Sequence, residues 1–372
     1  MRLAALVLAA GLSSRMGRLK PLLPLGDASL LGRAARLFHA AGIADILAVT
    51  GHRADEVRGE AGRLGLRSVH NPDFETGMFS SVQAGLEALP PGLDGVFVLP
   101  VDIPLVRPAT VRRLIKRLPE SPTQVLVPAF DGEPGHPPLL RPAAVDAALA
   151  WTGAGGLRAA LAALDTELLE VADAGVLFDL DTPEAYAEAL CRWERRDVPT
   201  RAEALALLRL HRAGERGLAH AQGVARAALA LGRALAAAGL SLDFELLEVA
   251  ALLHDIAKGS QEHEKEGGML LADLGYAPVA EIVAAHRDID PAGMERPGER
   301  ELVYLADKLV RGQERVNVEQ RFQEKLDRFA GNPEAVTAIT RRREHALAMR
   351  ALVERVAGRS LDAILDGEGP WD

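Results

Sequence analysis

Residues 3–21 read LAALVLAAGLSSRMGRLKP, and this stretch decides the fold of the first half of the chain. Residues 3–10 form a short, continuous apolar run, which is typical of a strand buried on both faces of a parallel sheet. The loop after it contains Gly11, which lets the backbone turn tightly, and the cations Arg15 and Lys20. Backbone N–H groups in such a loop can bind an anion, and both cations can bind phosphate oxygens. The stretch therefore predicts a strand followed by a phosphate-binding loop.

The loop has a second interpretation, as an ordinary strand-to-helix turn with exposed cations. It matches neither the G-x-x-x-x-G-K-[ST] pattern of P-loops nor the G-x-G-x-x-G pattern of dinucleotide sites, so these two classes are disfavoured. The choice between the two interpretations depends on which other residues lie at the same edge of the sheet.

Strands and helices alternate through the first half. Helical periodicity is found at 29–41, and strands are predicted in the following segments: 44–51, 66–70, 95–101 and 124–130. Strands that alternate with helices of this length indicate βαβ units and a mostly parallel sheet covered on both faces.

The pattern changes at residues 193–200 (WERRDVPT), which are charged and contain a proline. We place a linker there, between a domain of residues 1–192 and a domain of residues 201–372. No strand pattern follows the linker, and helices are predicted at 202–211, 216–239, 244–258, 263–274, 277–286, 299–310 and 335–357. The second domain is therefore predicted to be all-α.

Composition disfavours several classes of function. The 372 residues carry a formal net charge of −9, without the strongly basic balance typical of nucleic-acid binding. The single cysteine, Cys191, allows no internal disulfide, which fits a reducing compartment. The first apolar run leads into Gly-Leu-Ser-Ser-Arg rather than a signal-peptide cleavage site, and no run approaches the roughly 20 residues of a membrane helix. We expect a cytoplasmic protein that binds neither nucleic acid nor membrane.

Acidic residues are predicted at the edge of the sheet where the loop lies. Asp102 follows the strand at 95–101, and the carboxyl ends of parallel strands face the ligand crevice of an open α/β sheet. Asp179 and Asp181 are two residues apart, so they share one face of an extended segment. One of them can join Asp102 around Mg²⁺, which prefers carboxylate and phosphate oxygens. An alternative role for Asp181 is to cap the helix that begins near Pro183.

These segments resemble the MobA-like nucleotidyltransferases and, within them, the molybdenum cofactor cytidylyltransferase branch. The resemblance covers about residues 3–190. It is carried by the motifs L-A-A-G-x-S-x-R-M-G-x-x-K at 8–20, N-P-x-x-x-x-G-M-x-x-S-V at 71–82, V-D-I-P at 101–104, G-H-P at 135–137 and D-x-D-T-P at 179–183. It implies a Rossmann-like α/β domain that transfers a nucleoside monophosphate from an NTP to an acceptor phosphate and releases pyrophosphate.

The resemblance also implies roles for individual residues. Asp102 and Asp181 would hold Mg²⁺, while Gly135 and His136 would lie on the acceptor side. His136 has an alternative role as a loop histidine with a purely structural hydrogen bond. The implied nucleotide contacts are Ala10, Gly11, Ser13, Arg15 and Lys20 at the triphosphate and Ser81 at the base, with Arg15, Lys20 and Asp102 in the catalytic roles.

The implied substrates are CTP, favoured over GTP, and molybdopterin, with a molybdoenzyme as a partner that receives the cofactor. An alternative is a cytidylyltransferase for another small phosphate, such as a sugar phosphate or an isoprenoid precursor.

Histidine and aspartate recur in the helical half. His254 and Asp255 end a strongly apolar helix, where an imidazole and a carboxylate are costly unless they are paired or bound to metal. His220 lies in an upstream helix, and Asp307 interrupts the apolar side of a downstream one. This mixture of nitrogen and oxygen ligands suits Mn, Fe, Zn or Ni.

The ordered set resembles the HD-type metal phosphohydrolases over about residues 200–330. The resemblance implies one metal on His220, His254, Asp255 and Asp307. His263 and His286 lie where some members bind a second metal, and Lys258 would contact phosphate. An alternative role for Lys258 is that of a cation at the end of a helix before Gly259.

The two resemblances together predict a bifunctional enzyme. The alternative is that the HD-type half is a regulatory module that binds metal or nucleotide without turnover. Residues 311–328 are expected to form a solvated helix face, with a roof over the metal pocket as the alternative. The other histidines are predicted to be surface residues: His39, His52, His70, His211 and His345.

Overall fold

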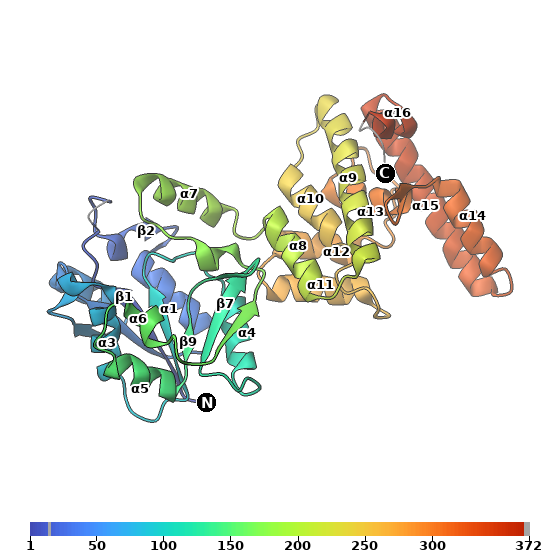
Figure 1. The fold of residues 1–372 in the computed structure, drawn as a ribbon. Coiled ribbons are helices and arrows are strands. Elements are labelled where there is room, and N and C mark those ends of the chain that lie inside the picture. Colours follow the sequence, from blue (N-terminus) through green and yellow to red (C-terminus); the bar gives the residue numbers. More distant parts are fainter. Residues whose placement is uncertain (14–15, 368–372) are drawn as a thin grey trace. The chain divides into compact units, whose positions relative to one another are not determined.

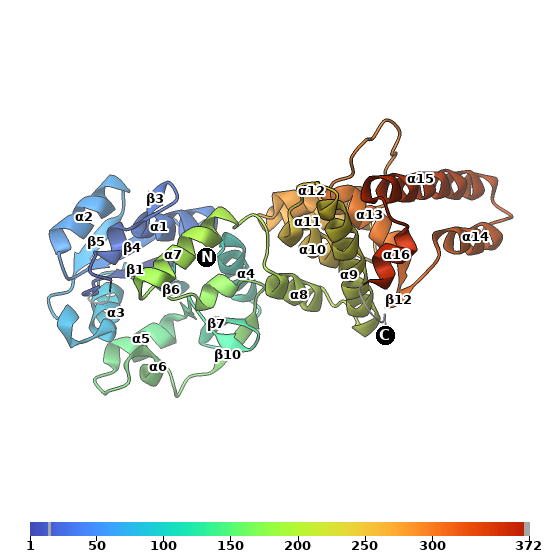
Figure 2. The same cartoon turned by 90° about the horizontal axis from the view of Figure 1, so that it is seen from above.

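The computed structural model describes residues 1–13 and 16–367. The chain folds as two units, Met1–Arg195 and Arg196–Asp372 (Figures 1 and 2). The boundary falls within the segment predicted as a linker, although the first residues of that segment still belong to helix α7 (Pro183–Glu194).

An eight-stranded sheet forms the centre of the first unit. Its strands are β1 Leu3–Ala9, β4 Asp45–Thr50, β5 Arg67–His70, β6 Gly95–Pro100, β7 Val125–Phe130, β8 Glu133–Pro134, β9 Leu139–Leu140 and β10 Thr166–Glu170. The order is β10-β7-β9-β6-β1-β4-β5, with β8 paired to β7. Central β1 runs parallel to β4 and β6, whereas β9 runs antiparallel to β6 and β7. The predicted mostly parallel sheet is confirmed.

Helices cover both faces of this sheet. On one face α1 (Leu30–Ala40) packs against β1 and α4 (Pro108–Arg117), and the rings of Phe38 and Phe97 are 5.7 Å apart. On the other face α3 (Met78–Glu87) packs with α5 (Pro142–Ala150) and α6 (Gly156–Ala160) over Leu6 and Leu8. Figure 2 shows α5 and α6 on the side of the sheet away from α1. The remaining elements of this unit are α2 Ala54–Arg63, α7, the hairpin of β2 Pro24–Leu25 and β3 Ala28–Ser29, and the 3-10 turns Lys20–Leu22, Phe74–Thr76 and Ala174–Leu177.

The second unit is helical, as predicted. Its helices are α8 Arg201–Leu210, α9 Glu215–Ala237, α10 Phe244–Leu253, α11 His263–Asp273, α12 Ala277–Ala285, α13 Glu299–Leu309, α14 Val318–Arg328, α15 Pro333–Ala357 and α16 Leu361–Asp366. Alanine-rich α9 packs against α10, α13, α15 and α16, because its small side chains permit close approach. At Gly232, for example, a Cβ atom would lie 2.7 Å from Leu247 Cδ2.

Two expectations for this unit were wrong in detail. Helix α10 ends at Leu253, five residues before the predicted end, because the chain continues in turns that lead to Gly259 at φ +119°. The segment 311–328 is not one helix. It begins in a hairpin of β11 (Val310–Arg311) and β12 (Glu314–Arg315), which turns at Gly312 with φ +63°, and only then forms α14.

Two helical glycines of the first unit are predicted to respond to alanine in opposite directions. A Cβ atom at Gly85 of α3 would lie 2.8 Å from Val49 Cγ2 and 3.0 Å from Leu6 Cδ1, whereas nothing lies within 4 Å at Gly59 of α2. Gly85→Ala should therefore destabilise the unit by about 1–3 kcal/mol through overpacking. Gly59→Ala should stabilise it by about 0.4–1 kcal/mol.

The measurement is urea unfolding of the full chain, with hydrogen exchange of peptides from β1 and β4 to locate the effect. Equal changes in the two variants would contradict the close packing of α3 on the sheet.

Candidate active sites

A hydrogen bond to Ser13 joins the two ends of the loop that follows β1. Ser13 has a positive φ of 55°, and its Oγ accepts a hydrogen bond of 3.1 Å from the backbone N–H of Lys20. The carbonyl of Ala10 accepts a hydrogen bond from the backbone N–H of His52, and a Cβ atom at Gly11 would meet no atom of the described residues within 4 Å. Arg15 lies outside the described residues. The loop therefore leaves open space beside Gly11 and delivers Lys20 to the carboxyl edge of the sheet.

Lys20 lies between two of the predicted carboxylates. Its Nζ is 2.9 Å from Asp102 Oδ2 and 2.6 Å from Asp181 Oδ1, and its side chain is only 10% exposed. Burial alone would lower the pKa of Lys20, but the hydrogen bonds and charges of Asp181 and Asp102 outweigh it and raise the pKa. The lysine is therefore held as a cation at this edge.

The same carboxylates form a cluster that can hold a metal ion. Oxygen atoms of Asp102, Asp179 and Asp181 lie within 4.8 Å of one another. The backbone N–H of Leu180 donates to the carbonyl of Asp102, which holds the two segments together. The alternative role of Asp181 as a helix cap was wrong, because Thr182 caps α7 by accepting from the N–H of Ala185. An all-carboxylate donor set of this kind fits Mg²⁺.

The predicted acceptor-side residues lie against a neighbouring turn. The backbone N–H of His136 donates to the carbonyl of Val176, and a Cβ atom at Gly135 would lie 2.5 Å from that same oxygen. Only glycine fits there. Burial lowers the pKa of His136, and the charge of Asp102 opposes this shift. His136 therefore lies within the electrostatic reach of the carboxylate cluster.

Ser81, the predicted base contact, is buried at the start of α3. Asn71 donates from Nδ2 to Ser80 Oγ at 2.8 Å and to Ser81 Oγ at 2.9 Å, and its Oδ1 accepts from the backbone of Asp73. Asn71 therefore positions both hydroxyls, and Ser80 Oγ in turn donates to the backbone carbonyls of Asp73 and Gly77. The sequence analysis gave Asn71 no role, although it begins the second motif.

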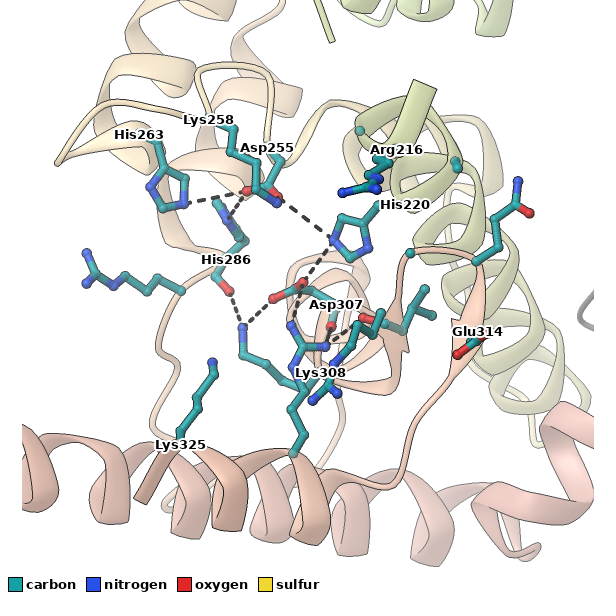
Figure 3. Close-up of a pocket in the computed structure, with 18 of the residues that line it drawn as sticks. Arg216, His220, Asp255, Lys258, His263, His286, Asp307, Lys308, Glu314 and Lys325 are labelled. Atoms are coloured by element: carbon teal, nitrogen blue, oxygen red, sulfur yellow. Dashed lines mark hydrogen bonds and ion pairs between the residues drawn. The ribbon is translucent and has the colours of Figure 1, made fainter. Parts of the chain in front are cut away.

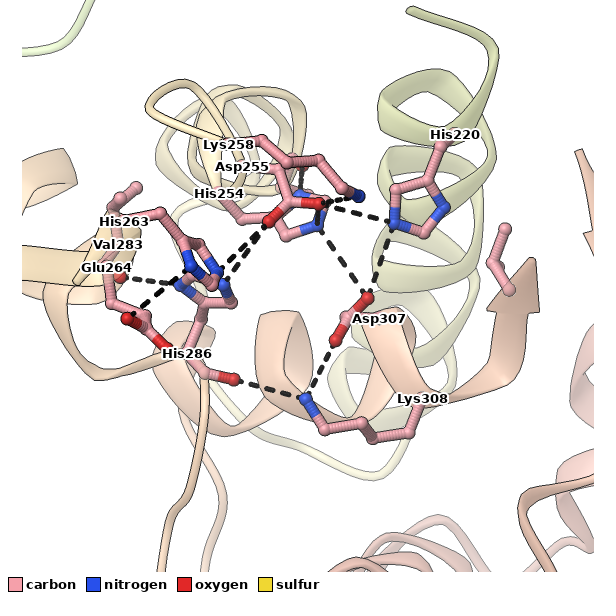
Figure 4. A network of polar contacts seen from close by, with 12 residues as sticks. His220, His254, Asp255, Lys258, His263, Glu264, Val283, His286, Asp307 and Lys308 are labelled. Atoms are coloured by element: carbon pink, nitrogen blue, oxygen red, sulfur yellow. Dashed lines mark hydrogen bonds and ion pairs between the residues drawn. The ribbon is translucent and has the colours of Figure 1, made fainter. Parts of the chain in front are cut away.

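The helical unit brings four histidines around one carboxylate (Figure 4). Asp255 Oδ2 lies 3.8 Å from His220 Nε2 and 3.5 Å from His254 Nε2. Asp255 Oδ1 lies 3.5 Å from His263 Nε2 and 3.7 Å from His286 Nε2. Two candidate metal triads, His220–His254–Asp255 and Asp255–His263–His286, therefore share the two oxygens of one aspartate.

Asp307 lies beside the first of these triads. Its Oδ1 lies 3.3 Å from His220 Nε2 and 3.7 Å from His254 Nε2. Its Oδ2 accepts from Lys308 Nζ at 2.7 Å. Burial would raise the pKa of Asp307, but Lys308, His220 and other positive neighbours hold the pKa well below its ordinary value. The four residues predicted to bind one metal are thus brought together from α9, from the C-cap and turn that follow α10, and from α13.

Backbone carbonyls orient two of the histidines. His254 Nδ1 lies 2.7 Å from the carbonyl oxygen of Ala251, and His286 Nδ1 lies 2.7 Å from that of Val283. This geometry assigns the proton to Nδ1 in each ring, so Nε2 is unprotonated and directs its lone pair toward Asp255. His254 Nε2 is fully buried without a hydrogen-bond partner. A buried nitrogen of this kind fits a metal ligand.

A basic cavity of about 1310 Å³ opens over this cluster (Figure 3). Lys258 lies five residues past the end of α10, so it is not a cation of the last helical turn, and its Nζ is 2.6 Å from Asp255 Oδ2. Lys308 and Arg321 also line the cavity, and the sequence analysis assigned a role to neither. Lys308 had a signal, because it directly follows Asp307. Arg321 had none, because it is one of several cations in a charge-rich stretch. The hairpin and α14 line the cavity too, as the alternative for 311–328 predicted.

His345, predicted to be a surface residue, is half-buried and has an acidic partner. Its Nδ1 lies 2.8 Å from Asp288 Oδ1, and the side chain is 20% exposed. The other four histidines in that group are exposed or half-buried and lie outside both clusters.

The sheet with its carboxylate edge is the arrangement of a nucleotidyltransferase, and the histidine–aspartate centre is that of an HD-type domain. Two parts of the chain match family models: residues 5–168 match the MobA-like NTP transferase domain, and residues 217–312 match the HD domain.

Relatives resemble the first unit. The chain is 28% identical to the molybdenum cofactor cytidylyltransferase of Escherichia coli K12 over 190 residues. The matched region covers 50% of this chain and 95% of the relative. The chain is 31% identical over 183 residues to a phosphoenolpyruvate guanylyltransferase of Rubrobacter xylanophilus, covering 48% of this chain and 86% of the relative. The crystal structure of Rv0371c from Mycobacterium tuberculosis superimposes with a TM-score of 0.46 at 29% identity, over 51% of this chain and 97% of that one.

None of the helices formed by the described residues combines the length and the apolar character that crossing a membrane requires.

Metal stoichiometry tests the arrangement around Asp255. Because this residue serves both triads, Asp255→Ala should reduce bound Mn²⁺ by about two equivalents, while His263→Ala should remove about one. His211→Ala, which changes an exposed histidine of the same unit, should remove none. The measurement is elemental analysis of the full chain after equilibrium dialysis. Loss of the same amount from Asp255→Ala and His263→Ala would contradict the shared carboxylate.

Proposed function

We propose that the first domain, residues 1–192, transfers CMP from CTP to molybdopterin. The observation that carries the proposal is the position of Lys20 at 2.9 Å from Asp102 and 2.6 Å from Asp181, at the carboxyl edge of the sheet. The identity to the cytidylyltransferase over 95% of its length supports the choice of substrates. The product is a cofactor that a molybdoenzyme would receive.

In this reaction an oxygen of the acceptor phosphate bonds to the α-phosphorus while the bond to the pyrophosphate oxygen breaks. Negative charge grows on the leaving group, so catalysis depends on fixed positive charge and on positioning. Lys20 provides a buried ammonium group that Ser13 and the two carboxylates hold in place. Mg²⁺ on Asp102 with Asp181 or Asp179 would supply further charge at the phosphates. Gly135 and His136 would orient the acceptor from beside the cluster.

The acceptor and the base have a second candidate. The identity of 31% to a phosphoenolpyruvate guanylyltransferase favours testing GTP, and small phosphates other than molybdopterin, in the same assay.

We predict pyrophosphate release from CTP with molybdopterin and Mg²⁺, and little from GTP, ATP or UTP. Asp102→Ala should lower the rate by about 10²-fold or more, because it removes a group that holds both Lys20 and the metal ion. Asp146→Ala, which changes an exposed carboxylate of α5, is the matched control and should leave the rate unchanged. Reaction of GTP with phosphoenolpyruvate, or of CTP only with a sugar phosphate, would overturn the proposed substrates.

We propose further that the second domain, residues 201–372, hydrolyses a phosphate ester. The observation that carries this is Asp255 between four histidine Nε2 atoms, beneath a basic cavity. One or two ions such as Mn, Fe, Zn or Ni on these ligands would activate water and stabilise the charge of the phosphate. Lys258 and Lys308 place ammonium groups on Asp255 Oδ2 and Asp307 Oδ2, at the floor of the cavity where a phosphate can bind them.

Hydrolysis is distinguished from a purely regulatory role by turnover. The Mn²⁺-loaded full chain should hydrolyse p-nitrophenyl phosphate or bis(p-nitrophenyl) phosphate, and His254→Ala should lower the rate by about 10²-fold or more because it removes a buried ligand. His211→Ala should behave as the wild type. Metal binding without turnover of any ester would instead assign this domain to regulation.

A further inference from the structure

The cavity over the HD centre carries more positive charge than a single phosphate requires. Eight lysine or arginine side chains line it against four carboxylates, in a chain whose formal net charge is −9. Of those carboxylates, Asp255 belongs to both candidate metal triads and Asp307 lies beside one of them, so bound metal ions would make the cavity more positive still.

Most of the cations near the cluster are already engaged. Lys258 pairs with Asp255, and Lys308 with Asp307. Arg321 donates from Nη1 to the carbonyls of Asp307 and Val310 and so fixes α14 to the end of α13. These groups belong to the ligand cluster and its support.

Lys325 is different. It rises from α14 into the cavity (Figure 3), and among the described residues no ion pair or hydrogen bond reaches its ammonium group, which lies 5.6 Å from the centroid of the Phe322 ring. Lys325 is exposed to solvent, and partial desolvation together with the charges of Arg321 and Lys308 lowers its pKa. A solvated ammonium group that faces other cations is available to bind an anion.

Arg342 of α15 adds a second donor to this wall of the cavity. Its buried Nε has no hydrogen-bond partner among the described residues, and it forms only a long ion pair of 4.0 Å with Asp288 Oδ2. Lys325 and Arg342 both lie beyond residues 217–312, so this wall of the cavity comes from outside the part of the chain that matches the HD domain.

We propose that the ligand of the HD centre carries two phosphate groups, one at the histidine–aspartate cluster and the other on Lys325 and Arg342. The proposal rests on the proposed hydrolase function of this domain and names its substrate class: a nucleotide-sized compound with a phosphoanhydride or with phosphates at two positions. The cavity of about 1310 Å³ exceeds the roughly 300–1,000 Å³ of ordinary small-molecule pockets, so it has room for both groups.

The chemistry leaves the second phosphate unchanged. Water adds across one P–O bond at the cluster: its oxygen bonds to phosphorus, and the leaving oxygen takes a proton. The second phosphate remains on Lys325 and Arg342 throughout, so it contributes to binding and orientation rather than to bond cleavage.

The test compares nucleotides that differ only in their phosphates. AMP, ADP and adenosine 3′,5′-bisphosphate are titrated calorimetrically into the Mn²⁺-loaded full chain, wild type, Lys325→Gln and Arg328→Gln. Arg328 is the matched control, an exposed cation of the same helix outside the cavity. The first domain is the same in all three proteins, so differences among them isolate the cavity.

We expect ADP or the bisphosphate to bind the wild type about ten-fold more tightly than AMP. Lys325→Gln should remove most of that preference, and Arg328→Gln should keep it. A preference that survives Lys325→Gln, or no preference in the wild type, overturns the inference. Failure of the hydrolase proposal looks different: the preference and its dependence on Lys325 remain, but neither these nucleotides nor the p-nitrophenyl esters are hydrolysed.

Discussion

The carboxylate of Asp255 faces two histidines with each of its oxygens, and the arrangement of the helical unit follows from this constraint. The four imidazoles come from α9, from the ends of α10 and α12, and from the start of α11, so these helix ends must meet at one point. Burial opposes the charge of Asp255, yet His254, His286 and Lys258 hold its pKa well below the ordinary value. Alanine-rich α9 also helps to bring the histidines together around Asp255, because its small side chains let α10 and α13 approach closely.

The site of the first unit also gathers carboxylates close together, at one edge of its sheet. Three carboxylates at the carboxyl edge of a sheet would repel one another, and Lys20 reduces that repulsion from within the group. The lysine is placed by the hydrogen bond of Ser13 to its backbone, and Asp181 by the bond between the Leu180 N–H and the Asp102 carbonyl. Local backbone contacts, rather than side-chain packing, set the geometry of this site.

Periodicity and motif order were enough to predict the parallel sheet, the helical half and the two clusters. Features that depend on turns or on distant contacts were not predictable from local patterns. The early end of α10 and the hairpin before α14 depend on Gly259 and Gly312, whose positive φ angles have no periodic signature. The pairing of His345 with Asp288 joins residues 57 positions apart, and the role of Arg321 appears only when α14 is docked on α13.

The two sites share one electrostatic device. Lys20 pairs with Asp102 in the first unit, as Lys258 and Lys308 pair with Asp255 and Asp307 in the second. A carboxylate oxygen that accepts a hydrogen bond from an ammonium group can instead bind a divalent metal ion, so the lysine and the metal ion compete for the same oxygens. When the metal ion binds those oxygens, the lysine is free to bind phosphate. Each site can therefore exchange internal ion pairs for contacts to a metal-bound phosphate without gaining an unpaired charge.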